Sequence, residues 1–409
     1  MGMLKGAVVP LGRLSDRKRI EGGFATVLPL YWLDFLLAIS VGMVPPLLPV
    51  LAAHWALSTV QAGLIYTVYA VGRLGSCYPA SDMRARWGTR TALVGGIASL
   101  TLGLLTCGLS SGFTAFLAGR FLMGVGMSAT FLALLAELLE RSPAVYRGRF
   151  TNAFEGVTIT SQSVGSFAVG PLALAIGWRG SFAVAGAIAL LGLTTWRRIG
   201  PLAGRRSSSA TRVVQAAGRR EPRGLAPVYG ASFAMALTWS GLFSTLAPLV
   251  GHHHYGLNLA ALGIILATTY LAELVGLLGL TFVVDRIRRE PVFMLGAASV
   301  ALGGIVLAAS VRPAFFVAGL ALVGLGFAVS MIPAALLADW TGGRITPWHL
   351  AAYRISTDAG MIFGPLVSGG LAHLTGERTA LGLAGLVLVG GGLGLVPRVR
   401  VRVGEMPPS

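Results

Sequence analysis

Long apolar runs separated by short polar segments fill almost the whole chain. A membrane-spanning helix needs about 20 predominantly apolar residues, and twelve runs of suitable length can be marked on the sequence. Glycine occurs 57 times, and in membrane helices it permits close helix–helix approach. The pattern predicts an all-α membrane protein with twelve transmembrane helices, at 26–51, 60–81, 89–109, 112–138, 148–175, 178–196, 227–250, 259–284, 291–310, 313–338, 349–374 and 378–396.

The composition supports a surface that faces lipid. Hydrophobic residues make up 55% of the chain and charged residues only 11%, whereas soluble domains carry about 25% charged residues. There are too few charges to cover a soluble surface. The formal net charge is +17, which in a soluble protein would suggest nucleic-acid binding, so the placement of the positive charges decides between the two interpretations.

The positive charges gather on one side of the predicted helices. If the N-terminus is cytoplasmic, 26 of the 32 Lys and Arg residues fall in cytoplasmic segments, three in external loops and three within the apolar runs. Cytoplasmic loops of membrane proteins carry such an excess. The sequence therefore predicts cytoplasmic N- and C-termini, and the dispersed charge indicates orientation in a lipid bilayer with no nucleic-acid partner.

The longest polar segment divides the predicted helices into two sets of six. It is basic and rich in small and polar residues, as expected of a linker. We expect a cytoplasmic N-terminal tail at 1–25, a six-helix bundle at 26–196, a cytoplasmic linker at 197–226, a second six-helix bundle at 227–396 and a cytoplasmic tail at 397–409.

The two sets of helices contain an internal repeat. At a spacing of 200 positions, residues 116–126 match 316–326 without a gap at six places, and Arg86 matches Arg286. Self-similarity at a fixed period indicates duplication. Parallel repeats are a known transporter design, in which two halves rock about a central site to alternate access. The repeat therefore predicts two pseudo-symmetric bundles.

Charged residues and glycines form motifs at related places in the two bundles. The loop after the second run contains Asp82, Arg86, Gly88 and Arg90. The loop after the eighth run contains Asp285 and Arg286. The fourth run contains Arg120, Gly124 and Gly126, and the eleventh contains Arg354, Asp358, Gly364 and Pro365.

In order and spacing these motifs resemble the major facilitator superfamily over essentially the whole chain, and the eleventh run resembles the drug–proton antiporter branch. The resemblance implies gating by the loop motifs, transport of a small molecule with protons, and a bacterial-type inner (plasma) membrane. The fifth run, at 165–170, departs from the antiporter pattern. We expect Gly124, Gly126, Gly364 and Pro365 to serve close helix packing.

Single ionisable residues inside the apolar runs are candidates for function, because a charge in the hydrocarbon region costs several kcal/mol on insertion scales. The position in the second half that corresponds to Arg120 is Leu320, so the fold does not require a charge there. The resemblance implies a role in proton coupling, and the alternative is a structural anchor to neighbouring helices. Asp34 is a second candidate for proton uptake. The alternative is that it lies at the membrane interface and has no role in proton coupling.

Two pairs of intramembrane charges are expected to meet between the halves. Arg73 and Asp358 lie at similar predicted depth, and the resemblance places their helices side by side. They would form a salt bridge that closes the cytoplasmic side, unless Asp358 pairs with Arg354, one turn away. Glu155 and Glu273 would also adjoin and share one proton, unless each is satisfied by local partners.

The sequence shows no constellation for catalysis. The only lysines, Lys5 and Lys18, do not follow the glycine pattern of an ATP-binding loop, and no metal-ligand or nucleophile motif stands out. We expect no cofactor and no enzymatic activity. His252–His254 are interpreted as part of a solvated external loop, since no Cys or acidic residue is near them in the sequence.

These observations favour a monomeric secondary active exporter that exchanges protons for a small, amphipathic organic molecule. The alternative is a proton-coupled uptake carrier for a metabolite on the same fold. A non-transporting membrane receptor or enzyme is a third possibility, weakened by the missing catalytic constellations. The sequence identifies neither the substrate nor the coupling stoichiometry.

Overall fold

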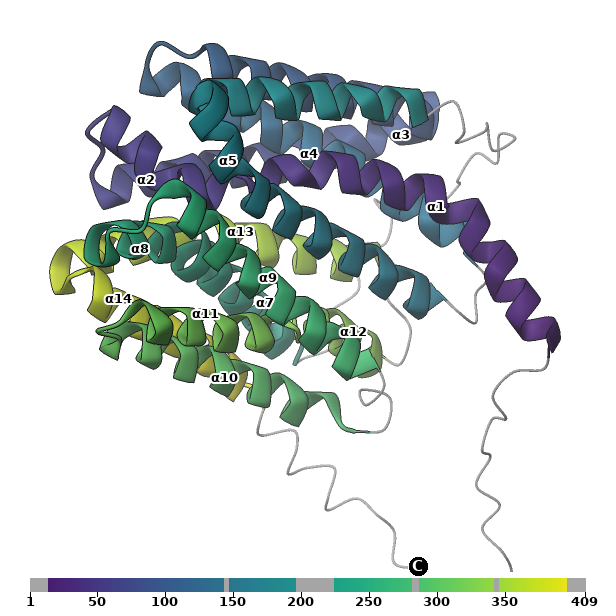
Figure 1. Cartoon of the computed structure of the whole chain (residues 1–409). Coiled ribbons are helices and arrows are strands. Elements are labelled where there is room, and N and C mark those ends of the chain that lie inside the picture. Colours follow the sequence, from purple (N-terminus) through teal and green to yellow (C-terminus); the bar gives the residue numbers. More distant parts are fainter. Residues whose placement is uncertain (1–13, 143–146, 196–223, 282–286, 342–345, 396–409) are drawn as a thin grey trace, which may run out of the picture.

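The computed structural model describes residues 14–142, 147–195, 224–281, 287–341 and 346–395, and Figure 1 shows them as two groups of helices, one above the other. Within these residues the structure is helical and contains no strand. Most of the predicted linker, residues 1–13 of the predicted N-terminal tail, the whole predicted C-terminal tail, and Asp285 and Arg286 lie outside the described residues.

The N-terminal half consists of α1 (Leu14–Gly42), α2 (Val44–His54), α3 (Thr59–Leu109), α4 (Phe113–Arg141) and α5 (Arg147–Thr195). α1 begins inside the segment expected to be a tail, so part of that segment is helical. Helices α3 and α5 each contain two arms that meet at a glycine, Gly88 with φ +87° and Gly177 with φ +76°. Glycine adopts such left-handed φ values without steric cost.

The C-terminal half is more finely divided. Its elements are α7 (Ala226–Thr238), the π-helical segment η3 (Trp239–Leu246), α8 (Ala247–Tyr255), α9 (Leu259–Thr281), α10 (Arg289–Ala309), α11 (Pro313–Phe327), α12 (Ile332–Trp340), α13 (Pro347–Thr375) and α14 (Glu377–Leu393). α7, η3 and α8 follow one another directly along the chain and together match the predicted seventh run.

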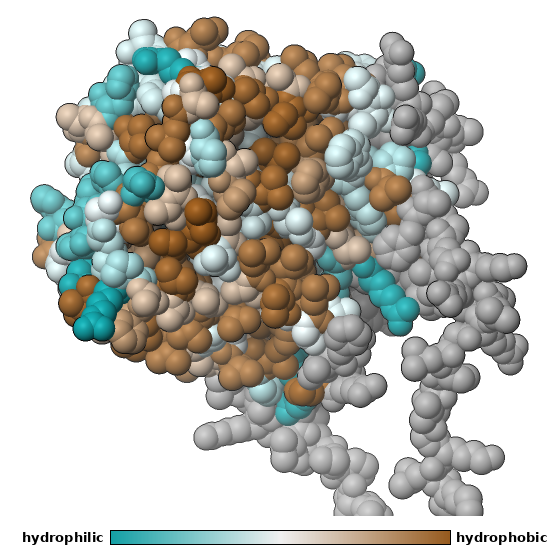
Figure 2. Space-filling view, viewed as in Figure 1, coloured by the Kyte–Doolittle hydropathy of each residue, from teal (hydrophilic) through white to brown (hydrophobic). Residues whose placement is uncertain are grey.

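These elements make twelve crossings. Eight helical runs of the described residues are long and apolar enough to span a membrane. Two of these are the double-armed α3 and α5, and α13 and α14 supply the remaining crossings. Figure 2 shows apolar residues spread over the middle of the visible face, with hydrophilic residues at its left end. The predicted fold class, an all-α membrane protein of two six-helix bundles, is confirmed.

Each half has its own buried apolar core. The halves meet where the first arm of α3 packs on α13, where the first arm of α5 packs on α9, and where α2 packs on α8. We call the first two contacts the α3–α13 joint and the α5–α9 joint. We call the end of the bundle that holds Gly88 and Arg141, predicted to be cytoplasmic, the inner end, and the end that holds Ser58 and Gly177 the outer end.

The duplication is visible in the packing as well as in the sequence. The Ser99 hydroxyl donates to the Leu122 carbonyl at 2.9 Å, and Ser299 donates to Leu322 at 2.8 Å. A Cβ on Gly103 would lie 2.6 Å from the backbone oxygen of Gly119, and the two residues 200 positions later, Gly303 and Gly319, repeat this approach at 2.7 Å. The two halves therefore pack their helices in the same register.

The glycines expected to serve packing stand at such close approaches. A Cβ on Gly124 would overlap the backbone of Tyr69 on the first arm of α3, and one on Gly126 would overlap the second arm. Gly364 lies against η3, where a side chain would overlap Ser240. Pro365 lies across the α3–α13 joint from Gly63.

Candidate functional site

The α3–α13 joint contains a buried carboxylate between two arginines. Asp358 on α13 is 0% exposed, Arg73 on α3 is 20% exposed and Arg354 is 22% exposed. An Arg73 Nη2 atom lies 3.4 Å from Asp358 Oδ1, while Arg354 donates from Nε to Oδ2 at 2.8 Å. The two alternatives considered for Asp358 thus occur together, and the contact within α13 is the tighter one.

Further contacts support this joint from both halves. The Thr67 hydroxyl on α3 donates to the Ile362 carbonyl on α13 at 3.0 Å. The Arg354 guanidinium lies 5.8 Å from the ring centre of Phe131 on α4, a cation–π contact between the halves. The Arg73–Asp358 pair is therefore one part of a wider contact surface.

The α5–α9 joint carries acidic residues in place of an ion pair. Glu273 on α9 is buried, and its Oε2 has no hydrogen-bond partner among the described residues. It lies within electrostatic reach of Glu155 on α5, which in turn lies within reach of Arg73. Around them the helices are close: Ser163 donates to the Ala267 carbonyl at 3.2 Å, and Ser166 donates to Gly263 at 3.1 Å.

A third carboxylate extends this group toward α1. Asp34 is buried and accepts a hydrogen bond from the Thr158 hydroxyl on α5 at 2.6 Å, while its Oδ1 has no partner among the described residues. Thr158 is one turn beyond Glu155, and Asp34 and Glu155 interact electrostatically. Asp34, Glu155 and Glu273 thus form a row from α1 through α5 to α9.

The internal repeat relates the two joints. A spacing of 200 positions pairs Arg73 with Glu273 and Thr158 with Asp358. The same two positions therefore hold an arginine and an aspartate at the α3–α13 joint, but a threonine and a glutamate at the α5–α9 joint. The pseudo-symmetry of the fold places opposite charges at one joint and an excess of negative charge at the other.

The charges do not balance when every group is ionised. Four carboxylates, Asp34, Glu155, Glu273 and Asp358, lie at or beside the two joints, together with two of the guanidinium groups, Arg73 and Arg354. An uncompensated buried charge is strongly unfavourable and is relieved by neutralisation. Bound protons can neutralise this excess, and the α5–α9 joint is where the excess lies.

Arg120 lies apart from the row of carboxylates. Its side chain is fully buried, donates from Nε to the Ile65 carbonyl at 3.0 Å, and lies 4.6 Å from the ring centre of Tyr69. Its Nη2 has no hydrogen-bond partner, and no ion pair joins it to a carboxylate of the described residues. These contacts join α4 to α3, and a role of Arg120 in proton coupling stays a prediction.

The loop motif at the inner end is partly in place. Arg86 donates to Asp82 at 2.8 Å, on an exposed surface, and Gly88 forms the turn between the arms of α3. Arg90 follows and is exposed. The second copy of the motif, Asp285 and Arg286, lies outside the described residues. The gating role of these residues stays a prediction.

Three features of the structure were missed from the sequence. Thr158, the partner of Asp34, carries no sequence signal. The ion pairs that join Arg84 to Glu140 and Arg289 to Asp339 tie neighbouring helices together at the inner end of each half.

The histidine run is the third feature. It has an acidic neighbour after all, because Glu377 lies 3.0 Å from Nδ1 of His253 and 3.6 Å from Nε2 of His254. The three histidines are exposed, as expected of a solvated segment, but they lie in the last turns of α8 and not in a loop. In the described part of the chain, no group of three or more His, Cys, Asp or Glu residues is arranged to hold a metal ion.

Comparisons with known proteins agree with this architecture. The sequence model of the Major Facilitator Superfamily matches residues 30–258 and 228–405. Among solved structures, the nucleoside transporter NupG superposes with a TM-score of 0.72 at 12% identity, covering 91% of this chain and 99% of that one. A D-xylose–proton symporter superposes with a TM-score of 0.69 at 16% identity, covering 90% and 96%.

Curated relatives match over shorter stretches. The multidrug resistance protein MdtL of Shigella flexneri is 29% identical over 111 residues, 27% of this chain and 28% of the relative. The niacin transporter NiaP of Acinetobacter baylyi is 24% identical over 152 residues, 36% of this chain and 34% of the relative. The chain thus spans about a third or less of the length of these relatives.

Proposed function

Because this chain belongs to the major facilitator superfamily, we propose that it exports a small, amphipathic organic molecule across the inner membrane in exchange for protons. The chain is a multi-pass membrane transporter. We propose the direction of transport, its coupling to protons and the residues that are responsible for both.

The observation that carries the proposal is the contrast between the two joints. Opposite charges attract at the α3–α13 joint, whether or not the carboxylates of the α5–α9 joint carry a proton. At the α5–α9 joint, Glu155 and Glu273 repel one another when both are ionised. Adding a proton removes this repulsion, so the proton occupancy of these carboxylates biases how closely α5 and α9 pack.

The coupling follows from this bias. With a proton bound, the α5–α9 joint packs as in the structure, where Gly156 lies against Leu274. When the proton leaves, repulsion favours the arrangement in which the halves rock apart at this joint. Substrate and proton would each favour a different one of these two arrangements of the halves. Such opposite preferences are the requirement for exchange. Asp34, held by Thr158, is a relay between Glu155 and the interior of the N-terminal half.

The Arg73–Asp358 pair has the role of a gate. It joins the halves toward the inner end, but its 3.4 Å contact is long and lacks hydrogen-bond geometry. Asp358 retains Arg354 as a partner when Arg73 withdraws. The gate can therefore open without leaving a buried carboxylate unpaired, which lowers the energetic cost of rocking.

Export is favoured by the motif of the eleventh run and by the similarity to a multidrug resistance protein. Uptake of a metabolite is the second candidate function, favoured by the similarity to a niacin transporter and by the structural likeness to a sugar–proton symporter. Both functions use the same joints, and they differ in which way substrate and proton flow.

The test of direction is transport by the purified protein in liposomes with an imposed pH gradient. Ethidium serves as a drug-like probe and nicotinate as a metabolite-like probe. An acidic lumen should drive accumulation of the substrate, because protons leave as substrate enters. Accumulation only under the opposite gradient would assign uptake with protons and overturn export.

A further inference from the structure

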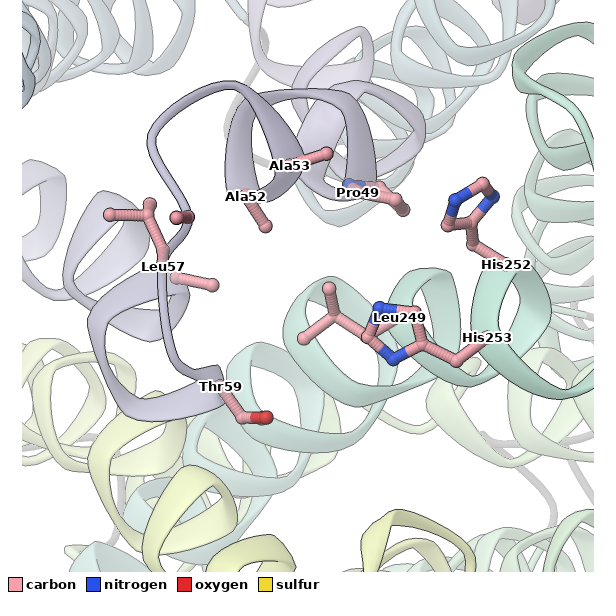
Figure 3. Close-up of a pocket in the computed structure, with 10 residues that line it drawn as sticks. Pro49, Ala52, Ala53, Leu57, Thr59, Leu249, His252 and His253 are labelled. Atoms are coloured by element: carbon pink, nitrogen blue, oxygen red, sulfur yellow. The ribbon is translucent and has the colours of Figure 1, made fainter.

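A cavity of about 220 Å³ lies at the outer end, next to the outer part of the α3–α13 joint, and none of the ionisable residues discussed at the two joints lines it. Figure 3 shows that α2 and the start of α3 form one side and α8 the other. Its walls therefore come from both halves of the protein. We call it the outer pocket, and no step of the proposed transport cycle uses it.

The outer pocket combines an apolar body with a polar rim. Ala53, Leu57 and Leu249 are among the apolar side chains that line it. Its polar groups are the Thr59 hydroxyl and the imidazoles of His252 and His253, whose rings border the pocket in Figure 3. The volume is below the range of about 300–1,000 Å³ typical of drug-sized ligands, so it suits a smaller molecule.

Hydrogen bonds orient both imidazoles. Nδ1 of His252 lies 3.1 Å from the Leu257 carbonyl, and Nδ1 of His253 lies 3.0 Å from Glu377. Each Nδ1 faces an acceptor and so carries the hydrogen, which leaves Nε2 of each ring as the second polar atom. The described residues supply no hydrogen bond to either Nε2. Once protonated, each ring presents an N–H donor from Nε2.

Glu377 contacts two residues that line the pocket, His253 and Thr59, but does not line it itself. Glu377 is engaged by His253 and His254 and accepts from the Thr59 hydroxyl at 3.4 Å. His54 packs on Trp178. Further titratable or charged groups on adjoining elements include Tyr255, Arg312, His373, Arg378 and, on α5, Arg179, none of them acidic.

We propose that the outer pocket is a second binding site, which takes a small organic acid with a short apolar body and, when filled, holds the outer end closed. The carboxylate accepts from the protonated imidazoles of His252 and His253. The apolar body lies against the alanine and leucine side chains. Because the ligand contacts both halves, it stabilises the arrangement in which they meet.

Direct binding to the full-length protein in lipid nanodiscs tests this proposal, with benzoate as the probe and its neutral analogue benzamide as the control. Equilibrium dialysis should detect one benzoate per chain. Affinity should be higher at pH 5.5 than at pH 7.5, because the proposed site needs protonated imidazoles as donors. Benzamide, which lacks the charge, should bind at least about tenfold more weakly.

Two kinds of variant locate the binding. Ala53→Leu fills the pocket without changing any charge, and the double variant His252→Asn/His253→Asn removes the donors; each should abolish saturable binding. His254→Asn is the matched control, since His254 contacts Glu377 but does not line the pocket. Asp339→Asn should also bind normally, because this exposed carboxylate lies at the inner end.

Three results would overturn the proposal: no saturable benzoate binding at either pH, equal binding of benzamide, or full binding by both the Ala53→Leu and the double-histidine variants. Binding is measured without transport, so failure here leaves proton-coupled export untouched.

Discussion

At the scale of single residues, the ionic contacts differ in strength in a way that suits a gate. Asp358 has a short hydrogen bond to Arg354 on its own helix and a longer contact to Arg73 on the other half. A buried carboxylate is stabilised by a partner that it always keeps, whereas a gate requires a contact that can break. The proposed gating role of Asp358 rests on this difference.

Double-mutant cycles should resolve the two contacts. With Arg354→Gln, Arg73→Gln and Asp358→Asn, we expect a coupling free energy above about 1 kcal/mol for Arg354 with Asp358, as for a hydrogen bond to a charged group. Arg73 with Asp358 should couple by about 0.5–1 kcal/mol. The measurement is the free energy of unfolding in detergent. A larger coupling for Arg73 would show that the contact between halves is the permanent one.

Sequence reasoning reached the charged residues but not their surroundings. Arg73, Glu155, Glu273 and Asp358 stand out because an isolated charge in an apolar run is conspicuous. The contacts of Arg120 could not be foreseen, since its choice of the Ile65 carbonyl over a carboxylate depends on side-chain packing between α3 and α4.

At the scale of elements, the repeat determines how helices approach one another. A Cβ on Gly126 would lie 2.5 Å from the Gly96 oxygen, and one on Gly326 would lie 2.6 Å from the Gly296 oxygen. Both helices of each pair are stiff, and such an approach leaves no room for a methyl group. The sequence predicted close packing at Gly126, and the structure identifies the second arm of α3 as its partner.

Gly126→Ala and Gly326→Ala should therefore destabilise the protein by similar amounts, at least about 2 kcal/mol each, because overpacking forces the backbones apart. Thermal unfolding in detergent provides the comparison. Gly279→Ala is the matched control: it is exposed, with nothing within 4 Å of the added Cβ. Equal stability of all three variants would be incompatible with the packing described.

Element boundaries show where sequence reasoning ends. Runs such as 291–310 predict α10 closely, since hydropathy changes sharply at its ends. The π-helical segment η3 within the seventh crossing was not foreseen, because the hydropathy pattern does not distinguish it from a continuous α-helix. The contact of Glu377 with His253 was missed because these residues are 124 positions apart and lie on different helices.

At the scale of the whole molecule, the halves are in contact at the outer end. A Cβ on Gly369 of α13 would lie 2.9 Å from the Cα of Val60 on α3, and α2 packs beside α8, at the left in Figure 1. Rocking of the halves must separate these surfaces if access alternates.

A disulfide between cysteines introduced as Val60→Cys and Gly369→Cys should lock the outer end and stop transport, and reduction should restore it. Each single-cysteine variant, which retains Cys77 and Cys107, controls for the native thiols. Loss of transport is measured in liposomes before and after addition of a reductant. Continued transport by the fully cross-linked protein would refute alternating access through this end.

The central claim is that the carboxylates of the α5–α9 joint carry the exchanged proton, and the most direct measurement compares two modes of transport in the Glu155→Gln variant. Asp339→Asn, an exposed carboxylate away from the joints, is the control. The variant should lose accumulation driven by a pH gradient while retaining substrate exchange at equal pH, because the joint can still rock but no longer takes up a proton. Gradient-driven accumulation at the wild-type level would contradict the account.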